Sequence, residues 1–138
     1  MTALRGSCLC GAVQFELTED PGRLAFCHCT TCKKISGGAG TANVGVRSAA
    51  IRILQGSEVL RTFQPGEGSA KTFCSVCGAN LFGGGWPKSE RASVRVPGLE
   101  GRFEPESGAH IFVRSVASWE TLPDDGLERF EIRCGNNV

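Results

Sequence analysis

Apolar and polar residues alternate over short stretches along most of the chain, which is the pattern of half-buried β-strands. The clearest case is residues 13–17, VQFEL, where three apolar side chains alternate with two polar ones. The strands expected from this pattern cover residues 13–17, 24–29, 41–46, 51–54, 59–63, 92–96 and 110–113. The one expected helix is a short turn over residues 30–35, ended by Gly37 and Gly38. Short strands separated by turns predict an all-β or mainly β fold.

Length and composition add a domain count and a cellular setting to this picture. The 138 residues are expected to form a single domain, 1–138. Glycine occurs 19 times, about twice its average frequency, which suits a turn-rich β protein. Residues 1–7, MTALRGS, carry no apolar run of a secretory signal, and no stretch reaches membrane-spanning length. A cytoplasmic location without a membrane partner is therefore expected.

Cysteine is the residue type that carries the most information about chemistry. Seven of the eight cysteines fall in three tight groups, at residues 8–10 (CLC), 27–32 (CHCTTC) and 74–77 (CSVC). A protein that uses cysteine only as a small apolar core residue would scatter them. Spacings of one and two residues, in a chain without a secretory signal, favour metal binding over disulfides.

The first expected metal site combines the two outer groups. Its four thiolates are Cys8, Cys10, Cys74 and Cys77. Four thiolates complete the tetrahedral shell of a structural zinc. Gly11 and Gly78 each follow a cysteine pair, where glycine permits a tight turn with N–H groups directed at sulfur. This site would tie residue 10 to residue 74 and so define the fold.

The second expected site is the three-thiolate set of Cys27, Cys29 and Cys32. On a strand, Cys27 and Cys29 point to one side and His28 to the other, so His28 is not expected to be a ligand. Three protein ligands leave one position open, as in catalytic zinc sites. The alternative is that Cys134, a histidine or water closes the site and that it is only structural.

The ligand charges restrict what the second site can do. Zinc with three thiolates has a net charge of −1, which makes it a weak Lewis acid for producing hydroxide but able to hold an added thiol. The sequence therefore favours thiol chemistry over hydrolysis. Seven thiolates and two Zn²⁺ ions would also change the formal net charge from +1 to −2. No basic field would remain, which argues against a nucleic-acid partner.

Several residues outside the cysteine groups also carry expectations, and two of them have both a functional and a structural interpretation. Lys33 follows the second site and could attract an anionic thiol such as glutathione, or be a solvated surface lysine. His110 could be a proton shuttle, although a hydrogen-bonded structural histidine on an apolar strand is the commoner case. Trp86 and Trp119 are expected in the core or in a pocket wall. Cys134, in a polar tail, is expected to be an exposed free thiol.

The order of the cysteine groups resembles a known family. Residues 6–11 (GSCLCG), 27–32 (CHCTTC) and 73–78 (FCSVCG) are similar to the motifs of the glutathione-dependent formaldehyde-activating (GFA) enzymes, whose relatives include centromere protein V. The resemblance extends to residues 110–113, HIFV, and to residues 125–126, DG. It spans nearly the whole chain.

This resemblance implies a fold, two metal sites and a reaction. The implied fold is a β-tent, in which small antiparallel sheets surround a structural zinc. The implied structural ligands are Cys8, Cys10, Cys74 and Cys77, and the implied catalytic ligands are Cys27, Cys29 and Cys32. The family reaction joins glutathione and formaldehyde into S-hydroxymethylglutathione and is classed as a carbon–sulfur lyase reaction.

The function hypothesis is a cytoplasmic zinc enzyme with two zinc ions per chain. It would add a glutathione-like thiol to a small aldehyde or another electrophile at the open Cys27/Cys29/Cys32 site. A non-catalytic, zinc-stabilised binding module for protein or nucleic acid is the alternative. A thiol-based redox or metal-buffering protein is a third interpretation.

Overall fold

The computed structural model describes residues 4–101 and 103–133. The chain divides into two compact units, one formed by residues 1–21 and 45–103 and the other by residues 22–44 and 104–138. The described residues form eleven β-strands and one α-helix, so the fold is mainly β, as expected. No described helix has the length and apolar character needed to cross a membrane.

The first unit contains a three-stranded antiparallel sheet. Its strands are β1 (Leu4–Ser7), β2 (Gln14–Leu17) and β5 (Ile51–Gln55), in the order β1-β2-β5. Gly6 pairs with Phe15 across the first two strands. A Cβ atom on Gly6 would lie 2.2 Å from the Phe15 ring, so only glycine leaves room for that ring.

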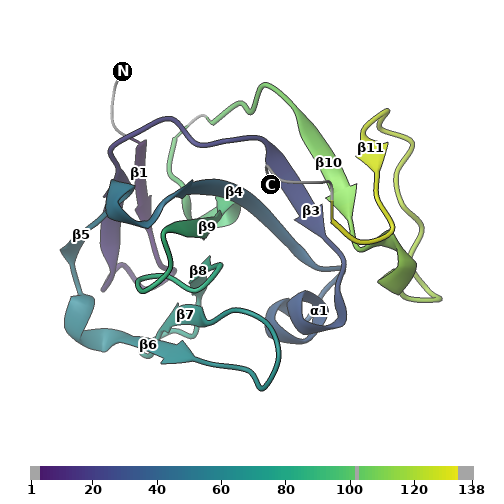
Figure 1. Ribbon diagram of the computed structural model, residues 1–138. Helices are drawn as coiled ribbons and strands as arrows, with labels where there is room; N and C mark the ends of the chain where they lie inside the picture. The colour runs from purple at the N-terminus through teal and green to yellow at the C-terminus, as the bar shows by residue number, and fades with distance from the viewer. Residues whose placement is uncertain (1–3, 102, 134–138) are drawn as a thin grey trace. The chain divides into compact units, whose positions relative to one another are not determined.

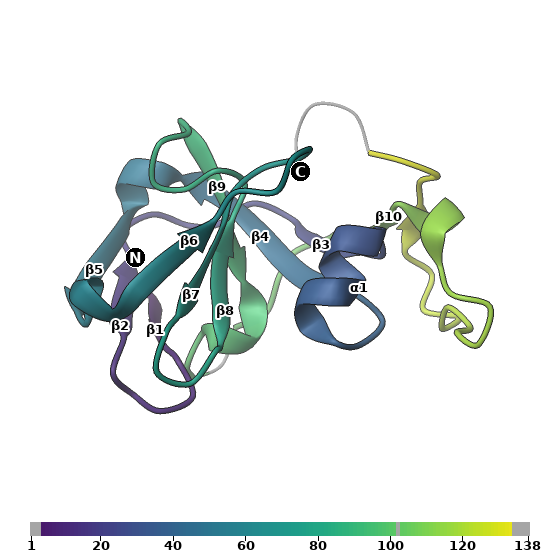
Figure 2. The ribbon, with the colours of Figure 1, turned by 90° about the horizontal axis from the view of Figure 1, so that it is seen from below.

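The same unit contains an antiparallel meander of four strands. These are β6 (Leu60–Phe63), β7 (Lys71–Cys74), β8 (Asn80–Gly83) and β9 (Arg91–Arg95). Figure 2 shows β6, β7 and β8 running side by side. Short 3₁₀ helices lie before β5 at Ser48–Ala50, between β5 and β6 at Ser57–Val59, and after β9 at Val96–Gly98.

The core of the first unit is aromatic and aliphatic. The Phe15 and Phe82 rings are fully buried and meet edge to face, with centroids 4.9 Å apart. Trp86 packs on Phe82 with a centroid separation of 4.7 Å, which agrees with its expected place at the core. The contact between Phe15 on β2 and Phe82 on β8 therefore joins the three-stranded sheet to the meander within the first unit.

The second unit contains a small mixed sheet and the helix. Its strands are β3 (Leu24–Cys27), the first four residues of β4 (Thr41–Arg47), β10 (Gly108–Ile111) and β11 (Glu128–Arg129). Strand β3 pairs antiparallel with β4 and parallel with β10, and β10 pairs parallel with β11. Figure 1 shows β3 and β10 side by side. The helix α1 (Thr30–Ser36) follows β3, and a 3₁₀ turn at Val113–Ser115 follows β10.

The expected elements are mostly present, with several differences. The helix is a seven-residue α1, and the strand expected over 24–29 ends at Cys27. Strand β1 was not expected, because Leu4 is the single large apolar residue in its LRGS sequence. The sheets are not wholly antiparallel, since β10 runs parallel to both of its neighbours. Trp119 is 83% exposed, so its expected place in the core is wrong.

Candidate metal centres

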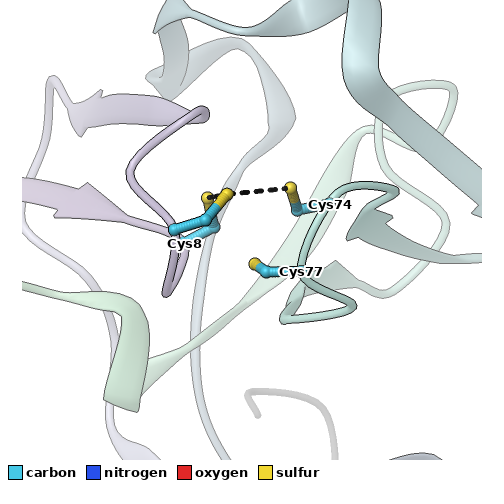
Figure 3. A group of neighbouring side chains, drawn as sticks. Cys8, Cys74 and Cys77 are labelled. Carbon is cyan, nitrogen blue, oxygen red and sulfur yellow. Dashed lines mark hydrogen bonds between the residues drawn. The ribbon is translucent and has the colours of Figure 1, made fainter.

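The first candidate centre brings together the pairs Cys8/Cys10 and Cys74/Cys77 of the first unit. In Figure 3, Cys8 faces Cys74 and Cys77. The four sulfurs of Cys8, Cys10, Cys74 and Cys77 all lie within 4.8 Å of one another. The Sγ atoms of Cys8 and Cys10 are 3.6 Å apart, and those of Cys10 and Cys74 are 3.9 Å apart. Tetrahedral zinc with Zn–S bonds of about 2.3 Å separates its sulfurs by about 3.8 Å. The cluster could therefore hold a metal ion and fits zinc.

Two similar turns supply these sulfurs. The N–H of Gly11 donates to the carbonyl of Cys8 at 3.2 Å, and the N–H of Gly78 donates to that of Cys74 at 2.8 Å. Gly11 and Gly78 have φ values of +81° and +79°. A Cβ atom would meet nothing within 4 Å at either glycine, so the requirement is for the left-handed backbone and not for space.

Backbone N–H groups point at the sulfurs of the first centre. The N–H of Val13 donates to Cys8 Sγ at 3.2 Å. The N–H groups of Ala79 and Cys10 lower the pKa of Cys77 to about 6. The pKa of Cys10 is raised to about 11: an N–H donated by Ala12 lowers it, but burial and the neighbouring thiols outweigh that effect. The turns therefore stabilise part of the negative charge, and a cation is needed for the rest.

The second candidate centre lies wholly in the second unit. The sulfurs of Cys27, Cys29 and Cys32 lie within 4.8 Å of one another, so this cluster could also hold a metal ion. Cys27 and Cys32 are 7% and 5% exposed and pack with Ala25 and Ile111. Cys29 is only partly buried. The three thiols thus share an apolar base and reach solvent through Cys29.

The start of α1 fixes the spacing of these three thiols. Cys29 is the N-cap residue, and its sulfur accepts the N–H of Cys32 at 3.3 Å. The Cys32 thiol and burial raise the pKa of Cys27 above its ordinary value. Without a cation, Cys27 therefore keeps its proton, and a bound metal would supply the charge that lets all three ionise.

The structure turns His28 away from the second centre. His28 Nε2 lies 2.9 Å from His110 Nδ1, and His28 Nδ1 lies 3.3 Å from the carbonyl oxygen of Ala39. Both ring nitrogens therefore have partners away from the thiols, which agrees with the expectation that His28 is not a ligand. Burial lowers the pKa of His28. No cysteine, histidine, aspartate or glutamate of residues 4–101 and 103–133 joins the three thiols as a fourth donor.

His110 occupies a structural environment that the sequence left open. It is 2% exposed, and its Nε2 lies 2.8 Å from Asp125 Oδ2. The hydrogen bond with His110 lowers the pKa of Asp125. Residues 125–126 stand out in the sequence only through the family resemblance, which gives Asp125 no partner. The available signal was that the chain has only two histidines, His28 and His110.

Lys33 and Cys134 are the other two residues for which the sequence gave an expectation. The Lys33 ammonium donates to the carbonyl of Ser115, so part of its hydrogen-bonding capacity is used inside the second unit. Cys134, which was expected to be an exposed thiol, lies outside the described residues.

Phe112 packs against the thiol cluster and has a φ of +57°, which is uncommon for a residue with a side chain. Sequence patterning gave no sign of that conformation.

Comparisons with known proteins identify the family and fold that this chain resembles. Residues 3–115 match the family model described as glutathione-dependent formaldehyde-activating enzyme. A relative from Halomonas elongata, named "Putative glutathione-dependent formaldehyde-activating enzyme", is 34% identical, and the alignment covers 96% of each chain. A crystal structure of a Rhodobacter sphaeroides protein superposes with a TM-score of 0.60 at 24% identity, covering 91% of this chain and 98% of the other, which supports the fold. The match over residues 3–115 places this chain in the GFA family.

Proposed function

We propose that the protein is a two-zinc enzyme that adds a small thiol, of the glutathione type, to formaldehyde or a similar aldehyde. The observation that carries this proposal is the three-sulfur cluster of the second unit, in which Cys29 is partly exposed and no fourth donor from the described residues takes part. An open position next to three thiolates suits the binding of one further thiol. The names of the family and of the Halomonas relative support the same substrates.

The proposed roles follow from the two clusters. Cys8, Cys10, Cys74 and Cys77 would hold a structural zinc, and Cys27, Cys29 and Cys32 would hold the second zinc. Bound zinc would keep an added thiol in its reactive thiolate form. In the reaction a sulfur–carbon bond forms, the carbonyl π bond breaks, and the proton of the thiol ends on the former carbonyl oxygen. The reverse reaction is the carbon–sulfur lyase direction.

The residues around the second cluster would contribute orientation and charge. Phe112 and the partly buried Phe130 pack against the thiols and would exclude water from one side of them. Lys33 would contribute positive charge near an anionic thiol, although its ammonium already donates to Ser115.

The test compares the unaltered protein with Cys29→Ser. Serine keeps a side chain suited to the N-cap of α1 but removes one thiolate, so helix stability and metal binding are separated. Zinc per chain is measured by elemental analysis. The rate of adduct formation is measured by exchange NMR with glutathione and formaldehyde, after subtraction of the uncatalysed rate.

We expect Cys29→Ser to lose one zinc and the rate enhancement, while the other zinc and the fold remain. A rate enhancement that survives when this zinc is lost would contradict the proposed site. Metal-dependent hydrolysis of simple esters at an enzyme-like rate, without an effect of thiols, would contradict the proposed chemistry.

A binding module is the second candidate, and two exposed side chains favour it. Leu9 and Val76 lie between the cysteines of the first centre and are 88% and 63% exposed. If the two side chains form one contiguous apolar patch, it would suit contact with a protein partner. A protein that shows both zincs but no thiol-dependent activity, and that loses a pull-down partner on Leu9→Ser, would support this candidate over the enzyme.

A further inference from the structure

Three side chains of the second unit, His28, His110 and Asp125, are linked in a row. His28 lies between Cys27 and Cys29 of the second centre, His110 lies on β10, and Asp125 lies in the segment that follows. His28 Nε2 is 2.9 Å from His110 Nδ1, and His110 Nε2 is 2.8 Å from Asp125 Oδ2. His28 and His110 are 8% and 2% exposed. The two buried histidines restrict one another strongly, because breaking a contact leaves an imidazole nitrogen unpaired and out of water, whereas the Asp125 side chain is 28% exposed.

The register of two parallel strands places the rings together. Phe26 on β3 pairs with His110 on β10, and Cys27 pairs with Ile111. Side chains alternate between the faces of a strand, so Phe26 and His28 share one face while Cys27 takes the other. The rings agree with this: His110 stacks on Phe26 and on His28, each with centroids 5.1 Å apart. The face opposite the thiols is thus filled by three packed rings.

A backbone group holds Asp125 at one end of the chain, and another lies near the His28 ring at the other end. Asp125 Oδ1 accepts the N–H of Leu127 at 3.1 Å, which fixes the carboxylate for His110. At the other end, His28 Nδ1 lies 3.3 Å from the carbonyl oxygen of Ala39. The backbone N–H of His28 also donates to the backbone carbonyl of Ile111 at 3.1 Å. The residue between Cys27 and Cys29 is therefore held through both its backbone and its ring.

A count of protons indicates which contact is weakest. Three contacts join two acceptor ends, the Ala39 carbonyl and the Asp125 carboxylate, through two imidazole rings. Two neutral imidazoles supply only two N–H groups. When both rings are neutral, the N–H of His110 donates to Asp125 and the ring N–H of His28 donates to His110. No ring N–H then remains for the Ala39 carbonyl, whose contact is also the longest of the three. Asp125, His110 and His28 therefore form the part of the chain that persists.

We propose that Asp125 and His110 are positioning residues that fix the ring of His28, and through it the Cys27–Cys29 backbone, so that the second centre is preorganised for metal. The proposal rests on the second metal centre of the proposed function. It assigns no contact with substrate to these three residues. Partners of this kind around a metal site commonly change metal affinity by about 10- to 100-fold.

The experiment titrates Co²⁺ into the second centre of the folded protein after a mild chelator has removed the metal there. The thiolate-to-cobalt absorption gives both affinity and geometry. The variants are His28→Ala, Asp125→Ala and Asp125→Asn. Asp124→Ala is the matched control, because Asp124 is the adjacent exposed carboxylate and no contact with the His28–His110 chain is found for it among the described residues.

We expect Asp125→Ala and His28→Ala to weaken Co²⁺ binding about tenfold. Their absorption bands should broaden, while the metal of the first centre and the unfolding midpoint of the first unit stay unchanged. Asp125→Asn can still accept from His110, so its affinity should lie closer to the unaltered protein than to Asp125→Ala. This rescue separates positioning from a loss of bulk stability.

Other results would overturn the proposal. Equal Co²⁺ affinity and spectra for the unaltered protein, His28→Ala and Asp125→Ala would show that the chain does not position the thiols. An equal loss in Asp124→Ala would show a general effect of charge. An unaltered protein that takes no Co²⁺ at the second centre would contradict the proposed function itself, and this inference with it. Catalytic activity is not needed for any of these readings.

Discussion

The Sγ atoms of Cys10 and Cys74 lie 3.9 Å apart, although 64 positions separate the two residues in the sequence. That separation is too long for a disulfide, which needs about 2.05 Å, and it fits two ligands of one tetrahedral zinc. The contact joins the turn after β1 to the end of β7 within the first unit. A metal held there would therefore act as a crosslink that closes a long segment of chain.

Removing metal from the first centre should destabilise the first unit severely. Structural zinc contributes about 10–16 kcal/mol in small zinc modules, comparable to the about 5–15 kcal/mol that stabilises a whole domain. We expect Cys74→Ser, or a strong chelator, to lower the unfolding midpoint sharply, and added zinc to restore it only in the unaltered protein. Calorimetry with zinc analysis measures this. An unchanged midpoint after complete zinc loss would show that the first centre is not structural.

Replacing either glycine of the two metal-binding turns should destabilise the protein by about 1–2 kcal/mol, the cost of the left-handed backbone for a residue with a side chain. Gly11→Ala and Gly78→Ala introduce no clash, so strain alone acts. Gly66→Ala is the control, since that position has open space and no positive φ. Denaturant unfolding measures the difference. Equal stability for Gly66→Ala and Gly78→Ala would contradict the strain argument.

In metal-free protein that is still folded, Cys77 should be alkylated faster than Cys10 at pH 7.5. Its pKa of about 6 makes it mainly thiolate there, whereas Cys10, at about 11, is protonated. The lower nucleophilicity of a low-pKa thiolate offsets part of this, which leaves a ratio on the order of tenfold. Cys10 is the more exposed of the two, so accessibility alone predicts the opposite order.

Iodoacetamide labelling followed by peptide mass spectrometry measures this ratio. Cys77 labelling should fall as the pH drops through about 6, because protonation removes the thiolate that its backbone N–H partners stabilise. Zinc-loaded protein is the control and should be protected at both residues. Faster labelling of Cys10 across pH 6–9 would contradict the assigned roles of the two turns.

Local sequence patterns were sufficient to predict the cysteine clusters and most strands. The clusters need only short spacings, and residues 14–17 show their alternation directly. Strand β1 and the His28–His110 contact were not predictable in this way. The first depends on Gly6 making room for Phe15, and the second on the parallel register of β3 and β10, which are more than 80 positions apart. Such pairings are properties of the folded chain and leave no periodic signal.

Gly40→Ala should disrupt the second centre while sparing the first. A Cβ atom at residue 40 would lie 2.0 Å from the carbonyl oxygen of Cys27, and the glycine has a φ of +152°. The loop that follows α1 must then move away from the Cys27–His28 backbone, which also separates the Ala39 carbonyl from the His28 ring. We expect the variant to bind one zinc per chain instead of two and to retain the unfolding behaviour of the first unit.

Gly38→Ala is the matched control, because its nearest neighbour for a Cβ atom is Ser36 Oγ at 3.8 Å and its φ is not positive. It lies in the same loop and makes the same chemical change without the clash. Elemental analysis after a mild chelator wash gives zinc per chain for both variants. Because the close approach of the loop to Cys27 is specific to residue 40, the two variants should differ by one zinc. If both keep two zincs, the loop does not hold the Cys27–His28 backbone, and the second centre tolerates movement there.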